Sequence, residues 1–269
     1  MKKIAIFLFV LCLSVAAFGQ DAGITKKELS PAEIDRIIKR VTANEGDFRA
    51  ALTSYVFNRN ATVNIIGLGG QIAGTYQRDS FMTFNEDGSR FEKVLRAPVA
   101  TTPPGFVTPE DLEDLGGVNP FALEPAFVSQ YNFSYLGVER IDELNLYVFE
   151  VRPKVIPDPK KSKMRLFTGR IWIDVDDLMI VKTKGKAVPE TKVNKFPIVE
   201  TYRDQIDGKY WFPIDARADD ELVFDDGSVV RIRMRVKYTN YAVGRSEVRI
   251  LDDVPDPKPT PSPTPKKPE

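Results

Sequence analysis

The stretch from Val230 to Tyr238 alternates strictly between apolar and cationic residues. Valine, isoleucine, methionine and tyrosine occupy its even positions, and three arginines and a lysine occupy its odd positions. Because successive side chains of a β-strand point to opposite faces, this period of two predicts a strand with one buried face and one solvated face. The rest of the chain then has to supply partners for such a strand and a cover for its buried face.

Similar apolar runs, rich in β-branched and aromatic residues, recur along the chain and are separated by short turns such as Asp207-Gly208 and Asp226-Gly227. Short turns join antiparallel neighbours, since parallel strands need long crossovers. Strands are expected at residues 55–65, 72–84, 90–96, 131–141, 146–154, 164–175, 178–186, 196–205, 209–216 and 228–241.

One long helix is expected before the strands. Ser30 and Glu33 have the spacing of a capping box, with proline at the first helical position. Apolar residues from Ile34 to Val41 follow at helical spacing and form one stripe. The polar sequence at residues 44–47 is expected to break or bend this helix, with one further turn beyond it.

These elements predict an α+β domain, an antiparallel meander of about ten strands with a leading helix. The segment from Pro98 to Val128 is rich in proline and glycine, and we interpret it as an insertion or lid between two groups of strands. Short helices are expected within it at residues 109–115 and 121–130.

Both ends of the chain differ from this body. Lys2 and Lys3, an apolar run and Ala17-Phe18-Gly19 have the form of a cleavable signal peptide at residues 1–19, which predicts an exported protein. Lipidation of Cys12 is the alternative, but bulky rather than small residues precede that cysteine. Residues 254–269 have proline at nearly every second position, so we expect a disordered spacer, or a ligand for a proline-binding partner. The domain itself is assigned to residues 20–253.

Composition excludes much chemistry. The chain has no histidine and one cysteine, so the commonest general base and the usual zinc ligands are missing. Lys and Arg number 38, as do Asp and Glu, so there is no electrostatic case for nucleic acid. We therefore predict a protein that is not an enzyme and that uses no metal or other cofactor.

Three local motifs have structural explanations. Residues 67–70 lack the spacing of a phosphate-binding loop and indicate a turn. The acidic residues 174–177 lack the pattern of a calcium loop and also indicate a turn. The cationic face of residues 231–237 could bind anionic lipid or another polyanion, but acidic residues of neighbouring strands are expected to pair with it. Those candidates are Glu200, Asp204, Asp219 and Glu221.

The order of elements resembles the LolA/LolB-type outer-membrane lipoprotein-sorting family. The resemblance rests on the leading helix and on five later segments. These are Leu146–Val151, Gly169–Asp174, Ile180–Lys182, Val199–Tyr202 and Tyr210–Ile214. It implies an incomplete antiparallel barrel, a half-barrel covered by helices, that holds acyl chains in an apolar cavity. The proline-rich tail and the insertion depart from the family.

We therefore expect non-catalytic binding or transport of a lipid or lipoprotein acyl chain in the bacterial periplasm or outer envelope. The alternative is a cargo-free interaction or stress-sensing module with the same fold, bound to an envelope protein. No transmembrane segment is expected after signal cleavage. The candidate cavity residues are apolar: Ile34, Ile38, Phe57, Val63, Ile72, Ile171, Ile173, Ile232 and Met234.

Overall fold

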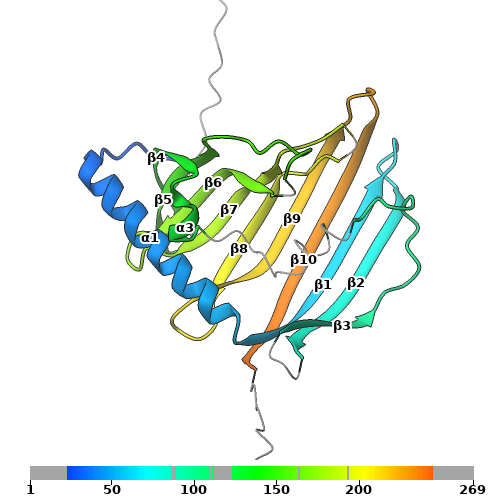
Figure 1. Ribbon diagram of the computed structural model, residues 1–269, viewed down its shortest axis with the longest axis horizontal. Coiled ribbons are helices and arrows are strands. Elements are labelled where there is room, and N and C mark those ends of the chain that lie inside the picture. Colours follow the sequence, from blue (N-terminus) through cyan, green and yellow to red (C-terminus); the bar gives the residue numbers. More distant parts are fainter. Residues whose placement is uncertain are drawn as a thin grey trace, which may run out of the picture.

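The computed structural model forms one curved antiparallel sheet of ten strands with a long helix across one face (Figure 1). It describes residues 23–85, 89–108, 111, 123–162, 164–192 and 194–244. The strand order is β3-β2-β1-β10-β9-β8-β7-β6-β5-β4, so the first and last groups of strands meet where β1 pairs with β10. The sheet does not close on itself, and β3 and β4 form its two edges.

The elements have the following bounds. The helices are α1 (Pro31–Leu52) and α3 (Pro125–Val128). The first five strands are β1 (Tyr55–Ile66), β2 (Ile72–Phe84), β3 (Arg90–Arg96), β4 (Tyr131–Ile141) and β5 (Leu144–Pro153). The last five are β6 (Leu166–Asp174), β7 (Ile180–Val188), β8 (Val199–Gln205), β9 (Trp211–Val223) and β10 (Val229–Val243).

The predicted meander is confirmed, and the one large difference is the length of β9. This strand continues to Val223 instead of ending at Ala216. Its second half contains three consecutive acidic residues, Asp219 to Glu221, which in the sequence alone are typical of a loop. In the structure two of them face the cations of β10, since Arg233 lies opposite Asp219 and Arg231 lies opposite Glu221. Opposite charges directly across a strand pair stabilise the sheet.

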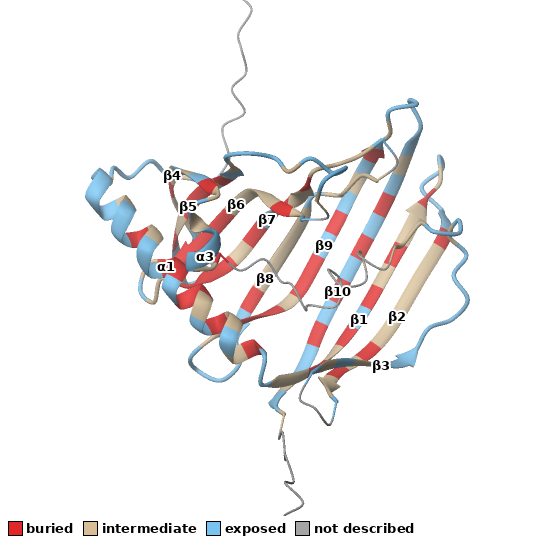
Figure 2. Ribbon diagram, in the orientation of Figure 1, coloured by how far each residue is buried: buried red, intermediate tan, exposed pale blue. Residues whose placement is uncertain are grey.

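The two faces of the sheet differ in polarity. We call the face against which α1 packs the inner face and the opposite one the outer face. Along β10 the even-numbered residues from Ile232 to Tyr238 are buried and the odd-numbered residues between them are exposed, as the alternation predicts (Figure 2). The cations of β10 therefore lie on the outer face.

Helix α1 begins as predicted but does not break. The side chain of Ser30 accepts from the backbone of Glu33, and the Glu33 carboxylate accepts from the backbone of Ser30. The expected interruption at residues 44–47 is wrong, because α1 runs without a gap to Leu52. Tertiary contacts explain the difference, since Asn44 donates to the carbonyls of Asp177 and Leu178 at 3.0 and 3.1 Å.

A buried ion pair holds α1 against the sheet. Arg203 of β8 donates to both carboxylate oxygens of Glu45, at 2.9 and 3.1 Å. The two side chains are 1% and 0% exposed, and the guanidinium also lies 4.8 Å from the ring centre of Phe48. Burial raises the pKa of Glu45, and the charge of Arg203 opposes that rise. The pair therefore places a charged residue of the helix at one defined point of the sheet.

The segment between β3 and β4 is described only in part. Its first part runs along β2, where Thr101 and Thr75 exchange hydrogen bonds at 2.9 Å and a Cβ on Gly74 would meet the Thr101 carbonyl at 2.9 Å. The expected helix at residues 109–115 falls almost wholly outside the described residues. The one expected at residues 121–130 is a four-residue helix, α3.

The predicted signal peptide and proline-rich tail, residues 1–19 and 254–269, also lie outside the described residues. Within the part of the chain that is described, no helix is both long enough and apolar enough to cross a membrane.

The Glu45–Arg203 pair predicts a specific pattern of stability changes. Glu45→Met should lower the free energy of unfolding by about 3 kcal/mol, because it leaves the arginine buried without its carboxylate. The double variant Glu45→Met, Arg203→Met should recover most of that loss, since it leaves no buried charge. Urea unfolding followed by circular dichroism measures both changes. A single variant within about 0.5 kcal/mol of wild type, which is close to the error of the method, would show that the pair does not hold α1.

Candidate functional site

Seven of the nine residues predicted to line an apolar cavity belong to two hydrophobic clusters, and Ile72 and Ile232 belong to neither. One cluster joins the first half of α1 to β5, β6 and β7, and it includes Ile34, Ile38, Ile171 and Ile173. The other extends from the end of α1 across β1, β9 and β10, and it includes Phe57, Val63 and Met234. Ile232 is buried on β10, whereas Ile72 is 60% exposed at the start of β2.

Most of these side chains already pack against one another. Ile171 and Ile173 are fully buried beneath α1, together with Phe149 of β5. The exposure of Ile72 places it outside both clusters. The inner face thus divides into a part that α1 covers and a part, over β9, β10 and β1, on which no described helix lies (Figure 1).

This second part has a floor of small and medium apolar side chains. Cross-strand registers place Ala216, Val236 and Ala61 in one row and Ala218, Met234 and Val63 in the next. All six are at most 7% exposed. Because three of the six residues are alanine, these side chains extend less far from the sheet than those of the Phe- and Ile-rich region under α1.

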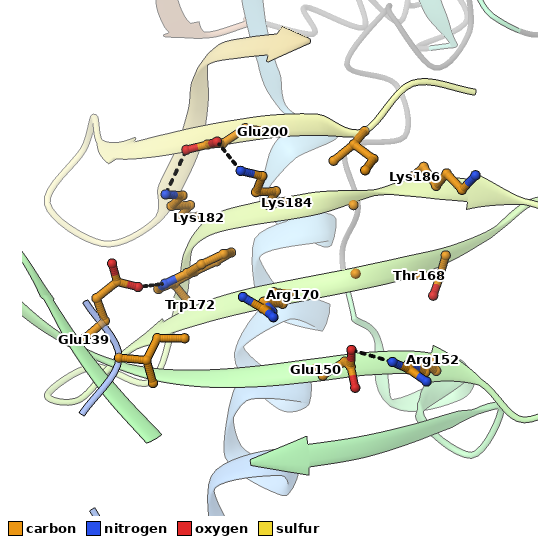
Figure 3. Close-up of a pocket in the computed structure, with 14 residues that line it drawn as sticks. Glu139, Glu150, Arg152, Thr168, Arg170, Trp172, Lys182, Lys184, Lys186 and Glu200 are labelled. Atoms are coloured by element: carbon orange, nitrogen blue, oxygen red, sulfur yellow. Dashed lines mark hydrogen bonds and ion pairs between the residues drawn. The ribbon is translucent and has the colours of Figure 1, made fainter. Parts of the chain in front are cut away.

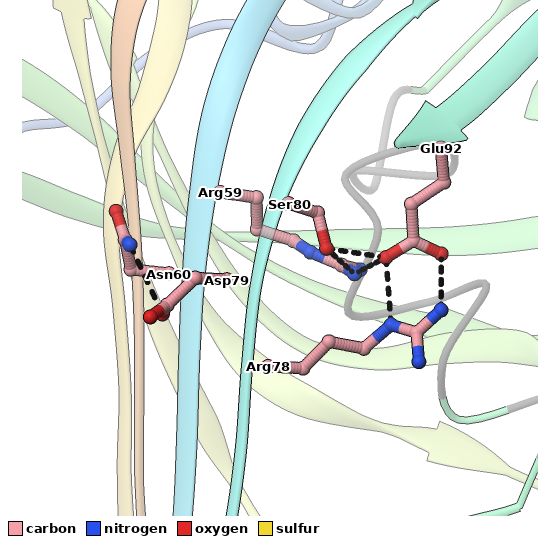
Figure 4. A network of polar contacts seen from close by, with 6 residues as sticks. All are labelled: Arg59, Asn60, Arg78, Asp79, Ser80 and Glu92. Carbon is pink, nitrogen blue, oxygen red and sulfur yellow. Dashed lines mark hydrogen bonds and ion pairs between the residues drawn. The ribbon is translucent and has the colours of Figure 1, made fainter. Parts of the chain in front are cut away.

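A polar network ends these rows on β2 and β3 (Figure 4). Arg59 is fully buried, and it donates to Ser80 at 3.1 Å and to the carboxylate of Glu92. Arg78 binds both oxygens of the same carboxylate, at 2.8 and 3.2 Å. Partial burial by itself raises the pKa of Glu92, but hydrogen bonds from Arg78 and Ser80 outweigh it, and the pKa lies below its ordinary value.

The network ties the edge strand β3 to β2 and β1. Asn60 and Asp79 pair at 3.0 Å on the opposite side of the same strands, so the network belongs to the inner face alone (Figure 4). This network was not predicted from the sequence. The sequence contains one indication of this network, because Arg59 is a cation in the same alternating register as the apolar Phe57 and Ala61.

A pocket of about 680 Å³ lies on the outer face, over β5 to β8 (Figure 3). None of the nine predicted cavity residues lines it. Its lining is mostly charged instead of apolar, and its aromatic side chain is Trp172. The lining residues are Ile24, Glu139, Glu150, Arg152, Thr168, Gly169, Arg170, Trp172, Lys182, Lys184, Gly185, Lys186, Ile198 and Glu200.

Ion pairs organise the side chains of this pocket. Glu200 of β8 lies between Lys182 and Lys184 of β7, at 2.8 and 3.4 Å from their ammonium groups. Lys182 also lies 4.6 Å from the ring centre of Trp172, whose indole N–H donates to Glu139 at 2.6 Å. The tryptophan is therefore covered by polar partners and forms the floor of the pocket.

These contacts perturb the acidity of Glu200. Partial burial by itself raises the pKa of its carboxyl group. Hydrogen bonds from Lys182 and Tyr202, together with the charges of Lys182 and Lys184, outweigh burial and bring the pKa to about 2. Glu200 therefore stays ionised under all ordinary conditions and keeps its two lysines.

The cations of β10 find partners close to those expected. Asp219 pairs with Arg231 and Arg233, at 3.4 and 3.1 Å, so this predicted partner is confirmed. Arg235 pairs with Asp215 at 3.0 Å, a partner that was not predicted. Glu200 binds lysines of β7 instead, because β8 is separated from β10 by β9.

The described residues contain no group of three or more His, Cys, Asp or Glu residues placed to hold a metal ion. The acidic residues 174–177 form a turn as expected, in which the Asp174 carboxylate accepts from the backbone of Asp176 and Asp177 at 3.1 Å.

No protein-family model matches the sequence, and a comparison with curated proteins finds no match. Solved structures do match. One is a DUF1329 family protein from Desulfovibrio piger, with 13% identity, a TM-score of 0.39, and coverage of 78% of this chain and 92% of that one.

A second is a putative outer membrane lipoprotein-sorting protein domain from Vibrio parahaemolyticus, with 11% identity, a TM-score of 0.34 and coverage of 77% and 92%. A third is MucB, with 11% identity, a TM-score of 0.28 and coverage of 77% and 94%. One of these matched structures thus carries the lipoprotein-sorting description, and the fold described above rests on the strands of this chain itself.

The shifted pKa of Glu200 predicts how stability depends on pH. Its carboxylate is stabilised in the folded state, so its contribution is present above its ordinary pKa of 4.5 and is lost as the pH falls toward 2. After allowance for solvent screening we expect a contribution of about 1 kcal/mol. Urea unfolding of wild type and Glu200→Gln at pH 6 and pH 2.5 measures it. The difference between the two proteins should be largest at pH 6 and much smaller at pH 2.5, and an equal difference at both values would contradict the assignment.

Proposed function

We propose that this chain is a non-catalytic binding protein of the bacterial cell envelope that holds a lipid or acyl chain against the inner face of its half-barrel. The observation that carries the proposal is the apolar floor of β9, β10 and β1, which lies beyond the cover of α1. Export is proposed from the signal-peptide pattern of residues 1–19.

The shape of the inner face supports a chain-like ligand. The two rows of the floor run across neighbouring strands, and their alanines leave a low path between bulkier groups. Aromatic side chains border this path, with Phe57 and Tyr238 at one end of it. An acyl chain that lies along the floor would contact apolar atoms only, which is the lining typical of ligand cavities.

The expected affinity follows from the size of the contact. Each methylene removed from water contributes about 0.8 kcal/mol, so eight buried methylenes contribute about 6 kcal/mol before the cost of ordering the chain. Such a ligand is held firmly and is still able to leave, which suits a protein that receives a chain and passes it on.

A cargo-free interaction or sensing module is the second candidate, and the burial of the floor favours it. Ala61 and Val236 are each 1% exposed, so the inner face is already dry in this structure. The pocket described above lies on the other face. A module of this kind would bind an envelope protein and no acyl chain, and binding measurements separate it from the carrier.

Met234 provides the test, because its side chain lies in the floor and is 7% exposed. Met234→Glu should reduce binding of a fluorescent fatty acid at least tenfold, since an unpaired carboxylate is strongly unfavourable in a dry apolar site. Met234→Gln is the milder variant if the glutamate prevents folding, and Met234→Leu should bind as wild type does. Circular dichroism shows whether each variant is folded.

Arg233→Glu is the matched control, because it places the same carboxylate on the outer side of the same strand. It should bind fatty acid within a factor of two of wild type, since Arg233 is exposed. Equal binding of fatty acid by every folded variant would show that the β10 floor is not part of the binding site. Absence of binding by folded wild type would overturn the carrier and favour the cargo-free module.

A further inference from the structure

The outer-face pocket is independent of the proposed carrier site. It lies over β5 to β8, on the side of the sheet opposite to α1 (Figure 3). Strand alternation separates the two sites, since Ile171 points to α1 while Arg170 and Trp172 on either side of it line the pocket. A volume of about 680 Å³ is large enough for a small-molecule ligand.

The pocket has a small surplus of positive charge. Its lining carries five cationic side chains, Arg152, Arg170, Lys182, Lys184 and Lys186, and three carboxylates, Glu139, Glu150 and Glu200. This leaves a surplus of two positive charges. Glu190 contacts Lys186 at 2.9 Å from beyond the lining and reduces the surplus to one. The complete chain has equal numbers of cations and anions, so positive charge is concentrated here by the fold.

Register brings the donors together at one end of the pocket. Lys182, Lys184 and Lys186 occupy alternate positions of β7, so they share a face at intervals of about 7 Å. Arg170 lies directly opposite Lys184, and Thr168 lies opposite Lys186. Between these two pairs, Gly169 lies opposite Gly185. By strand alternation the side-chain positions of these glycines point to the inner face, where a Cβ on Gly185 would meet the ring of Phe167 at 2.6 Å, so only their backbone lines the pocket.

The carboxylates leave part of this charge available. Glu139 accepts from Trp172, and Glu150 accepts from Arg152 at 2.7 Å. Glu200 has two lysine partners, of which Lys182 is the closer. Lys184 is 52% exposed, so its ammonium group is able to turn toward a ligand while Lys182 keeps Glu200 paired.

We propose that this pocket binds phosphate groups, carried either by a soluble phosphorylated molecule or by a lipid headgroup. Ammonium and guanidinium groups form strong charge-assisted hydrogen bonds with phosphate oxygens. The hydroxyl of Thr168, next to Lys186, adds a neutral donor on the same face. The size of the pocket favours a ligand with more than one phosphate or with a further polar group.

Titration calorimetry with tripolyphosphate at low salt tests the proposal. The pocket variant is Lys184→Gln with Lys186→Gln. The matched control is Arg231→Gln with Lys237→Gln, which removes the same two charges from exposed positions of the outer face on β10, outside the pocket. We expect wild type to bind, the pocket variant to bind at least tenfold more weakly, and the control to stay within twofold of wild type.

Two results would overturn the proposal. Wild type that does not bind tripolyphosphate would exclude a phosphate site, and equal weakening in the two double variants would show diffuse attraction to the whole outer face. Met234→Glu, if folded, should bind tripolyphosphate as wild type does. Failure of the inner-face carrier and failure of the phosphate site are therefore separate outcomes.

Vesicles distinguish the two sources of phosphate. A lipid headgroup is the ligand if phosphatidylglycerol vesicles bind wild type but do not bind the pocket variant. Added tripolyphosphate should then release wild type from the vesicles. Binding of tripolyphosphate without binding of these vesicles would identify a soluble molecule. Phosphatidylcholine vesicles are the control, since they carry no net charge, and equal binding to both kinds of vesicle would exclude the headgroup.

Discussion

The buried contact between Glu45 of α1 and Arg203 of β8 is the interaction on which the arrangement of this protein depends. An open sheet of ten strands has one apolar face that must be covered, and hydrophobic burial by itself has no preferred direction. A charge pair without exposure is costly unless both members meet in good geometry. It therefore selects one position of α1, and that position decides which strands the helix covers.

Because the helix covers only part of the inner face, the sheet presents two different surfaces. Beneath α1 the side chains are large and interlocked, as with Phe149, Ile171 and Ile173. Beyond it, small side chains of β9, β10 and β1 form a low floor. The outer face carries the exposed cations of β10 and the charged pocket, whereas Val148 and Trp172 on β5 and β6 are buried there.

The edges of the sheet show how an unclosed barrel is protected. At one edge, Glu92 of β3 receives hydrogen bonds from β2 and β1, so the short edge strand is held by charge as well as by its backbone. At the other edge, Thr25 pairs with Val138 of β4 and covers part of the unpaired backbone. Edges that are shortened or covered in this way resist pairing with other chains.

The sequence by itself determined the local structure: the cap of α1 at Ser30, the bounds of several strands such as β2 and β4, and the inward face of β10. Each of these depends on neighbours in the chain, so periodicity and turn chemistry are enough. Only the tertiary structure decided the continuity of α1 through Glu45, the length of β9 and the burial of Arg59. It also placed charged residues of five strands around one outer-face pocket. These features depend on pairings between distant residues, such as the 158 positions that separate Glu45 from Arg203, and no local pattern contains that information.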